Sequence, residues 1–172
     1  MGEFAPVSSE GQKHEDREKV IRTARTLEKY KQFFGPELGQ GNELILDIGA
    51  GDSTTADEIA ELSDHHAQVI RLDFDYLDNP PEGSTPAVAA DATKMPFADE
   101  SFDRLVSLWM MPHVGSEVGA EVVAEMIRIT KPGGKIMLFP GRPFKFLKSE
   151  IAVRQPNDGD PPTLVITKPE GF

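Results

Sequence analysis

A glycine turn flanked by carboxylates is the part of this sequence best suited to chemistry. Residues 44–57 read LILDIGAGDSTTAD, a short apolar run that enters a glycine turn and then the start of a predicted helix. Glycines let a backbone approach a ligand closely, and such a helix start usually binds a phosphate. Asp47 and Asp52 lie in this turn, so it is better suited to a ligand with positive charge.

Two more carboxylates stand at the ends of predicted strands. Asp73 closes the second strand in VIRLDFD, and Asp91 follows the third in VAADAT. Ligands of open α/β sheets bind outside the carboxyl ends of the strands, where an acidic side chain after the second strand accepts both hydrogen bonds of a ribose diol. Taken singly, each aspartate could instead cap a turn or be solvated. Together with Asp47 they favour a ligand that contains a ribose.

The known phosphate-binding motifs do not fit. The dinucleotide fingerprint G-x-G-x-x-G fails because Thr54 occupies its last position, and the chain has no G-K-[ST]. A dinucleotide would also bring its pyrophosphate beside Asp52. S-adenosylmethionine has a ribose, no phosphate, a sulfonium and an ammonium, and it is therefore the cofactor that the sequence predicts.

The elements that must position these residues alternate between strands and helices. Strands are predicted at residues 43–48, 67–72, 87–90, 104–109 and 135–139, and helices at residues 13–34, 54–62 and 116–129. This alternation implies a parallel α/β sheet. Two later strands, at 150–154 and 163–167, are joined by the turn-rich QPNDGDPP, so the last strand should run antiparallel. The predicted fold is a Rossmann-like open sheet, mostly parallel, with helices on both faces.

Length and composition fit one domain. Residues 1–12 are polar and without periodicity, and we expect them to be disordered or left by an expression vector. Residues 13–172 should form a single domain. Its parts would be an N-terminal helix (13–35), a cofactor-binding core (43–140) and a C-terminal hairpin (150–168).

Composition also narrows the functional classes. The chain has 18 basic and 29 acidic residues, a net charge of −11, which disfavours generic nucleic-acid binding. It has no cysteine, so disulfides and thiolate metal sites are excluded, and we predict no metal site. There is no apolar leader and no apolar run near the roughly 20 residues of a membrane span. A soluble cytoplasmic protein is expected.

The order and spacing of the motifs resemble those of class I S-adenosylmethionine-dependent methyltransferases. The likeness is greatest to type 11-like enzymes, the small-molecule branch that includes ubiquinone and menaquinone methyltransferases. It covers residues 44–139 and rests on LILDIGAGDS, RLDFD, AADATKMPFADESFDRLVSLWMMPHV and ITKPGGKIML. The resemblance implies an enzyme that transfers a methyl group to a small-molecule acceptor.

The resemblance also implies where the cofactor's methionyl part would lie. It would be surrounded by Asp47, Gly49, Ala50 and Gly51, and the backbone near Leu108 would meet its ammonium group.

The adenosine part would lie further along the same edge. Asp73 would hold the ribose hydroxyls and Phe74 would lie against the adenine. Asp91 would accept a hydrogen bond from the adenine amino group, and the Ala92 amide would donate to the ring.

Methyl transfer from a sulfonium is an in-line displacement that depends on positioning and desolvation, so no metal is obligatory. His113, just past the fourth predicted strand, is the candidate general base for an acceptor that must lose a proton. It could equally be a polar or capping residue. Trp109, Met110 and Met111 could line the acceptor pocket or pack in the core.

Two departures from the family pattern bear on the acceptor. Residues 75–86 contain consecutive prolines and cannot form a full helix. Only GRPFKFLKS stands where the family has a helix and a substrate-binding insertion. We therefore expect a minimal version of the fold that lacks a substrate insertion.

Two alternatives to a small-molecule methyltransferase remain open. One is a cofactor-binding, non-catalytic module completed by a partner subunit or a second copy. The other is a protein or RNA methyltransferase, which the basic residues Arg142, Lys145, Lys148 and Arg154 would favour.

Overall fold

The computed structural model describes residue 33 and residues 41–63, 66–81, 85–141, 152–157 and 160–171, with backbone alone at 62, 152–157 and 160–161. The chain divides into two compact units, residues 1–36 and 37–172. Phe33, which is helical, is the described residue of the first unit. The rest of the helix predicted at 13–35, and residues 1–12, lie outside the described residues. Every element below belongs to the second unit.

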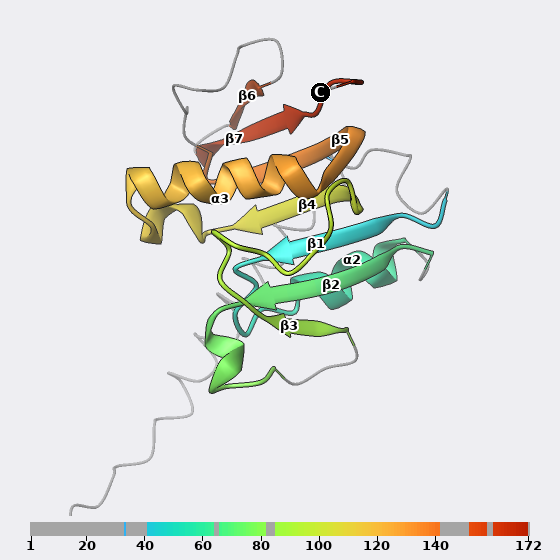
Figure 1. Ribbon diagram of the computed structural model, residues 1–172, viewed down its shortest axis with the longest axis vertical. Helices are drawn as coiled ribbons and strands as arrows, with labels where there is room; N and C mark the ends of the chain where they lie inside the picture. Colours follow the sequence, from blue (N-terminus) through green and yellow to red (C-terminus); the bar gives the residue numbers. More distant parts are fainter. Residues whose placement is uncertain are drawn as a thin grey trace, which may run out of the picture. The chain divides into compact units, whose positions relative to one another are not determined.

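A seven-stranded sheet forms the centre of this unit (Figure 1), in the order β3-β2-β1-β4-β5-β7-β6. The strands are β1 (Leu44–Ile48), β2 (Gln68–Asp73), β3 (Ala87–Ala89), β4 (Phe102–Leu108), β5 (Thr130–Phe139), β6 (Ala152–Asn157) and β7 (Asp160–Thr167). The chain moves outward from β1 to β3 and then returns to the other side of β1 for β4. The strand order therefore reverses between β1 and β4.

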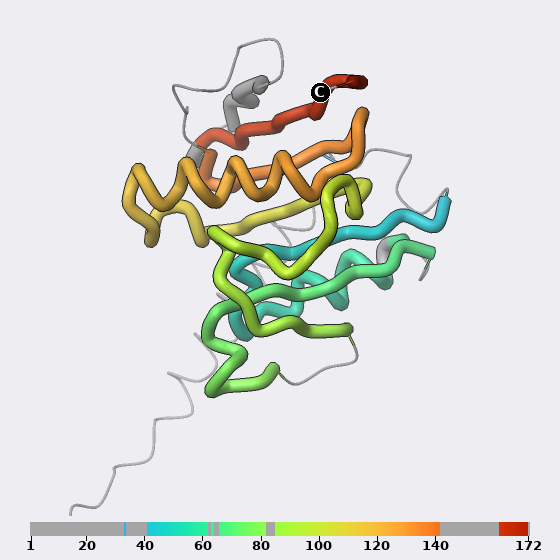
Figure 2. Tube along the Cα trace, viewed as in Figure 1, coloured from blue at the N-terminus to red at the C-terminus, as the bar shows by residue number. Residues whose placement is uncertain are grey.

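The strand directions confirm the predicted fold class. Parallel pairs join β1 to both β2 and β4, β2 to β3, and β4 to β5. β7 is antiparallel to both β5 and β6, as expected for the second strand of a C-terminal hairpin. Figure 2 traces the segments that follow β1, β2, β3 and β4 away from the same edge of the sheet.

Two helices cover opposite faces of the sheet. α2 (Thr55–Leu62) connects β1 to β2, and α3 (Ser116–Ile129) connects β4 to β5. These right-handed connections step in opposite directions along the sheet, so they place their helices on opposite faces. Figure 1 shows α3 in front of the sheet and α2 behind it. No helix in the described part of the chain is both long enough and apolar enough to cross a membrane.

The buried side of α3 builds the main core. Val122, Met126 and Ile129 are buried, as their helical spacing predicts, and pack with apolar residues of β1, β4 and β5. Burying such a side chain stabilises the fold by roughly 1.5–3 kcal/mol. Val118 has the same spacing but is 44% exposed. Val118 belongs to the first turn of α3, and its side chain lines a cavity at the carboxyl ends of the strands.

The segment 131–134 differs from prediction. We predicted a helix that ends at residue 129 and a strand that begins at residue 135, but β5 already begins at Thr130. Thr130 pairs with Phe102 and Lys135 with Arg104, so the residues between them bulge from the ladder. The bulge is held because the Gly133 amide donates to the Lys168 carbonyl (2.8 Å) and the Lys168 amide donates to Gly134 (3.0 Å). Both partners are remote in sequence, which local turn signals do not reveal.

The region after β2 forms only a short helix. The 3-10 helix η2 (Asp75–Leu77) is followed by a turn and then by residues without regular structure up to 81, in agreement with the expectation that the prolines prevent a full helix. A second 3-10 helix, η3 (Met111–His113), follows β4. The segment 142–150, where we expected no room for a substrate insertion, lies outside the described residues.

Candidate active site

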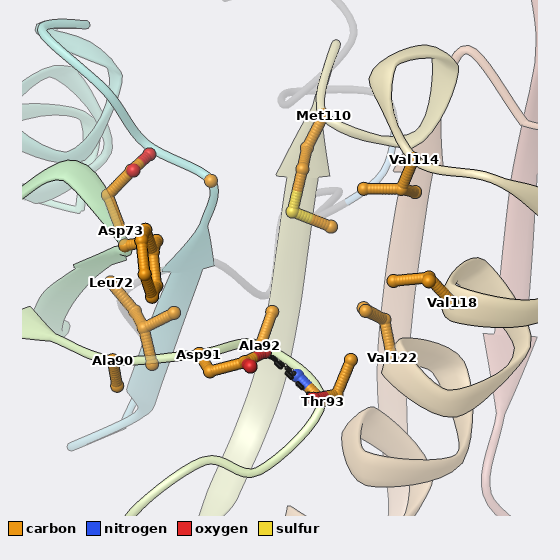
Figure 3. Close-up of a pocket in the computed structure, with 12 residues that line it drawn as sticks. Leu72, Asp73, Ala90, Asp91, Ala92, Thr93, Met110, Val114, Val118 and Val122 are labelled. Atoms are coloured by element: carbon orange, nitrogen blue, oxygen red, sulfur yellow. Dashed lines mark hydrogen bonds between the residues drawn. The ribbon is translucent and has the colours of Figure 1, made fainter.

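A cavity of about 240 Å³ opens at the carboxyl ends of the strands, beside α3. It lies where the strand order reverses, which is where open α/β sheets bind ligands. Figure 3 shows its residues on two sides, one from the ends of β2 and β3 and the other from the segment after β4 and from α3. The lining residues are Gly49, Leu72, Asp73, Phe74, Ala90, Asp91, Ala92, Thr93, Met110, Val114, Val118 and Val122.

The structure brings five of the predicted cofactor-binding residues to this cavity: Gly49, Asp73, Phe74, Asp91 and Ala92.

Four other predicted cofactor-binding residues, Asp47, Ala50, Gly51 and Leu108, are not part of its wall. Asp47 and Ala50 are buried, while Gly51 and Leu108 are half-buried. Gly51 nevertheless contacts the wall, because its amide donates to Asp73 Oδ2.

The glycine turn has a backbone that other residues adopt only with strain. Gly49 and Gly51 have φ values of 70° and 53°, in the left-handed region. The amides of Gly49 and Ala50 both donate to the Leu72 carbonyl, at 2.8 and 3.2 Å, which ties the turn to the end of β2. A Cβ on Gly51 would meet open space, so this residue leaves its backbone accessible.

Asp73 joins the turn to the cavity. Its Oδ2 accepts from the Gly51 amide at 2.8 Å, and its Oδ1 accepts from the Asp75 amide at 3.0 Å. A carboxylate has about four acceptor positions, so each oxygen keeps capacity for one more hydrogen bond. Those two acceptors are what a vicinal diol requires.

Tyr76 is hydrogen-bonded to the glycine turn, and sequence reasoning did not predict this contact. It is buried, and its hydroxyl donates to the Gly51 carbonyl at 2.6 Å. Burial raises the pKa of Tyr76 to about 12, so the phenol stays a donor at neutral pH. Its position three residues after Asp73 is the only sequence signal that could have suggested this contact.

A second unpredicted residue, Arg71, stands beside Asp47. The two are register partners on β2 and β1, and both are about 2% exposed. Burial raises the pKa of Asp47 to about 7, the positive charge of Arg71 opposes this rise, and Asp73 adds to it. Within the described chain Asp47 Oδ2 is buried without a hydrogen-bond donor. The Asp47 carboxyl therefore changes between its neutral and its charged form near neutral pH.

Asp47→Asn is expected to abolish a pH dependence of stability between about pH 4 and 7. The folded pKa of about 7 lies above the ordinary value of 3.8, so the folded chain binds this proton more tightly than the unfolded chain. The free energy of unfolding that Asp47 contributes is therefore fully present below about pH 4 and is lost as the pH rises to about 7. This pKa difference corresponds to roughly 4 kcal/mol.

Urea unfolding of both proteins at several pH values between 4.5 and 8 measures this effect. The free energy of unfolding of the variant, relative to that of the parent, should rise by a few kcal/mol across this range. A constant difference would show that Asp47 has an ordinary pKa.

Asp91 begins a tight turn that keeps it ionised. Its Oδ1 accepts from both the amide and the hydroxyl of Thr93, each at 2.8 Å. These hydrogen bonds lower the pKa of Asp91 below its ordinary value. Because both bonds go to Oδ1, Oδ2 is the oxygen that can accept a hydrogen bond from a ligand.

The opposite wall of the cavity is apolar. Met110, Val114, Val118 and Val122 point into it from the segment after β4 and from α3 (Figure 3). Trp109, next to Met110, is 37% exposed. The site therefore pairs carboxylates on one side with a hydrophobic surface on the other.

Other sequence-predicted groups lie outside this wall. His113 is exposed and belongs to η3, between the lining residues Met110 and Val114, but does not itself line the cavity. Met111 is buried in the core. The side chains of the basic residues at 142, 145, 148 and 154 lie outside the described part of the structure. Among the described residues, no cluster of three or more His, Asp or Glu could hold a metal ion.

Comparison with known proteins agrees with this arrangement. A demethylmenaquinone methyltransferase from Mycobacterium sp. (strain JLS) is 36% identical over 103 residues, which cover 59% of this chain and 42% of that protein. One from Beutenbergia cavernae is 34% identical over 115 residues, which cover 61% and 45%. The chain thus spans less than half the length of these relatives.

A solved structure shares the fold of this protein. A putative S-adenosyl-L-methionine-dependent methyltransferase from Methanococcus maripaludis matches with a TM-score of 0.62 at 18% identity, covering 100% of this chain and 99% of that one. The family described as "methyltransferase domain" matches residues 46–138, more than half of the sequence. This chain therefore belongs to the methyltransferase domain family.

Proposed function

We propose that this chain binds S-adenosylmethionine and transfers its methyl group to a small-molecule acceptor. The observation that carries the proposal is the cavity itself. It joins a glycine turn, a diol-binding carboxylate and a second carboxylate to an apolar wall, at the point where the strand order reverses. The names of the relatives support the same type of reaction, and the name of the structural neighbour supports the same cofactor.

The residues present fit this cofactor. Asp73 offers two remaining acceptors for the ribose hydroxyls, and Asp91 Oδ2 offers one for the amino group of adenine. The Ala92 amide would donate to the ring, and Phe74, 61% exposed, would cover its face. Among the described residues that line the cavity, none is a Lys, Arg or His, so no side-chain cation competes with the ligand's positive groups.

The glycine turn suits the methionyl part. Gly51 leaves open space above its backbone, Asp73 places a carboxylate nearby, and Asp47 adds negative charge when it is ionised. Met110 lies directly over Gly49, so this flexible side chain must turn aside to admit a ligand along the turn. Leu108, half-buried at the end of β4, would present its backbone to the ammonium group.

The bound cofactor supplies an electrophilic methyl group on a sulfonium. The chain's own residues hold it, align the acceptor and exclude water through the wall of Met110, Val114 and Val118. A base is needed only where the acceptor loses a proton, and His113 in η3 is the candidate that lies nearest in sequence to this wall.

The apolar wall supports an uncharged, hydrophobic acceptor. Two relatives are named for methylation of demethylmenaquinone, and we propose an aromatic ring compound of comparable hydrophobicity as the acceptor class. A partner subunit or a second copy would complete the acceptor side if the chain alone binds the cofactor without turnover.

Calorimetric titration of the full chain with S-adenosylmethionine and, separately, with NAD tests the cofactor. We expect binding at micromolar strength for the first and none for the second, because the pyrophosphate would meet Asp52. Methyl transfer from labelled cofactor to a panel of hydroquinones then tests the reaction. Absence of S-adenosylmethionine binding would overturn the proposal, whereas binding without turnover would favour the non-catalytic module.

A further inference from the structure

Arg128 on α3 holds the loop that carries Asp91 and Ala92. This loop, residues 90–101, connects β3 to β4. Arg128 donates from Nη2 to the Met95 carbonyl (3.2 Å) and from Nη1 to the Phe97 carbonyl (2.9 Å). One guanidinium therefore binds two backbone groups of a loop more than 30 residues away in sequence.

Glu125, one turn earlier on α3, pairs with Arg128 and also binds this loop. Its Oε1 accepts from Arg128 Nε at 2.9 Å and its Oε2 accepts from Nη2 at 2.8 Å, a two-bond pairing that fixes the guanidinium plane. Oε2 also accepts from the Met95 amide at 3.1 Å. The ion pair thus holds both the amide and the carbonyl of Met95, whose side chain is buried.

The other end of the segment is fixed to the sheet. The Ala90 amide donates to the Asp73 carbonyl at 3.2 Å. Only residues 91–94 lie between this anchor and Met95, and they are folded by hydrogen bonds from Thr93 and Lys94 back to Asp91. The position of Asp91 and Ala92 is consequently determined by anchors on both sides.

We propose that Arg128, with Glu125, is a positioning residue for recognition of the adenine base. It would act through Met95, keeping Asp91 Oδ2 and the Ala92 amide where the amino group and ring nitrogen of adenine arrive. This inference rests on the proposed function. The Arg128 side chain is 32% exposed, and ion pairs that exposed add little to global stability, so the effect of removing it should be local.

The test compares two ligands on the same protein. S-adenosylhomocysteine carries the 6-amino group of adenine, whereas S-inosylhomocysteine carries a 6-oxo group that would face the Asp91 carboxylate. The inosine ring also carries a proton on N1, so it offers a donor where adenine offers an acceptor, and the remaining groups of the two ligands are the same. We expect the parent chain to prefer the adenine ligand at least about tenfold in Kd. In Arg128→Met the ratio of the two Kd values should fall to about threefold or less.

Asp99→Asn is the matched control. Asp99 also pairs with Arg128 (2.7 Å), but its side chain is 74% exposed and the backbone of Met95 is hydrogen-bonded to Glu125 and Arg128 instead. This variant should keep the parent ratio. Arg128→Lys retains the charge without the planar fork and should give an intermediate ratio.

The outcomes separate the two proposals. If the parent chain binds neither ligand, the proposed function fails before Arg128 is tested. If the parent discriminates and Arg128→Met weakens both ligands equally, Arg128 has only a structural role and the inference is wrong. Should Arg128→Met fail to fold, the Arg128→Lys variant provides the test. A ratio of the two Kd values equal to that of the parent would then show that Arg128 does not position the adenine-binding groups.

Discussion

Replacing Asp73 with alanine should lower the affinity for S-adenosylmethionine about 100-fold or more. Asp73 is the carboxylate at the end of β2, and its two remaining acceptor positions match the two hydroxyls of a ribose. Hydrogen bonds to a charged group contribute roughly 1.5–3 kcal/mol each, so losing two accounts for the expected change. Calorimetric titration of the parent and the variant measures it.

Asp78→Ala is the control for the change in charge. Asp78 is exposed, lies just past η2 and is not part of the cavity wall, so its removal should change affinity by less than about threefold. Thermal unfolding of Asp73→Ala is needed as well, since the Gly51 and Asp75 amides also lose their partner. If both variants bind as the parent does, the diol assignment of Asp73 is refuted.

Gly49→Ala should destabilise the fold by about 2–5 kcal/mol and abolish measurable cofactor binding. Alanine at a φ of 70° costs roughly 1–2 kcal/mol. The new Cβ would also lie 2.6 Å from Met110 Cβ and 2.7 Å from its Cγ, and overpacking of this kind costs roughly 1–3 kcal/mol. Urea unfolding gives the stability, and titration gives the binding.

Two companion variants separate backbone strain from overlap. Gly51→Ala has a similar backbone with open space around the new Cβ, so it should cost only about 1–2 kcal/mol in stability. Met110→Gly removes the overlapping atoms, so adding it to Gly49→Ala should recover at least about 1 kcal/mol relative to additive effects. Strict additivity would show that the two residues are not in contact.

The sequence predicted the sheet edge that carries the site because strand ends and glycine turns are local features. The apolar run before Asp47, and the position of Asp73 at the end of β2, are set by neighbours in the chain. Parallel pairing then brings the ends of β1, β2 and β3 to one edge, which topology rules alone determine.

Contacts that depend on how the helices and loops pack on the sheet were not predictable from the sequence in the same way. Val118 has the spacing of a core residue, yet only its axial position on α3 decides that it meets the cavity. The hydrogen bonds from Tyr76 to Gly51 and from Arg128 to Met95 likewise join segments that are far apart in the sequence. Only the assembled fold brings these segments together. His113 shows the converse, since its place after β4 did not bring its side chain to the wall.

The pairing of β1 with β4 has a consequence for the order in which the chain is made. The Leu44 amide binds the Asp103 carboxylate, 59 residues later, and Ile45 pairs with Arg104. Ribosomes add about 5–20 residues per second, so β4 is synthesised roughly 3–12 s after β1. During that interval the edge of β1 that later pairs with β4 has no neighbouring strand, so the centre of the sheet cannot close until the chain has been made beyond Arg104.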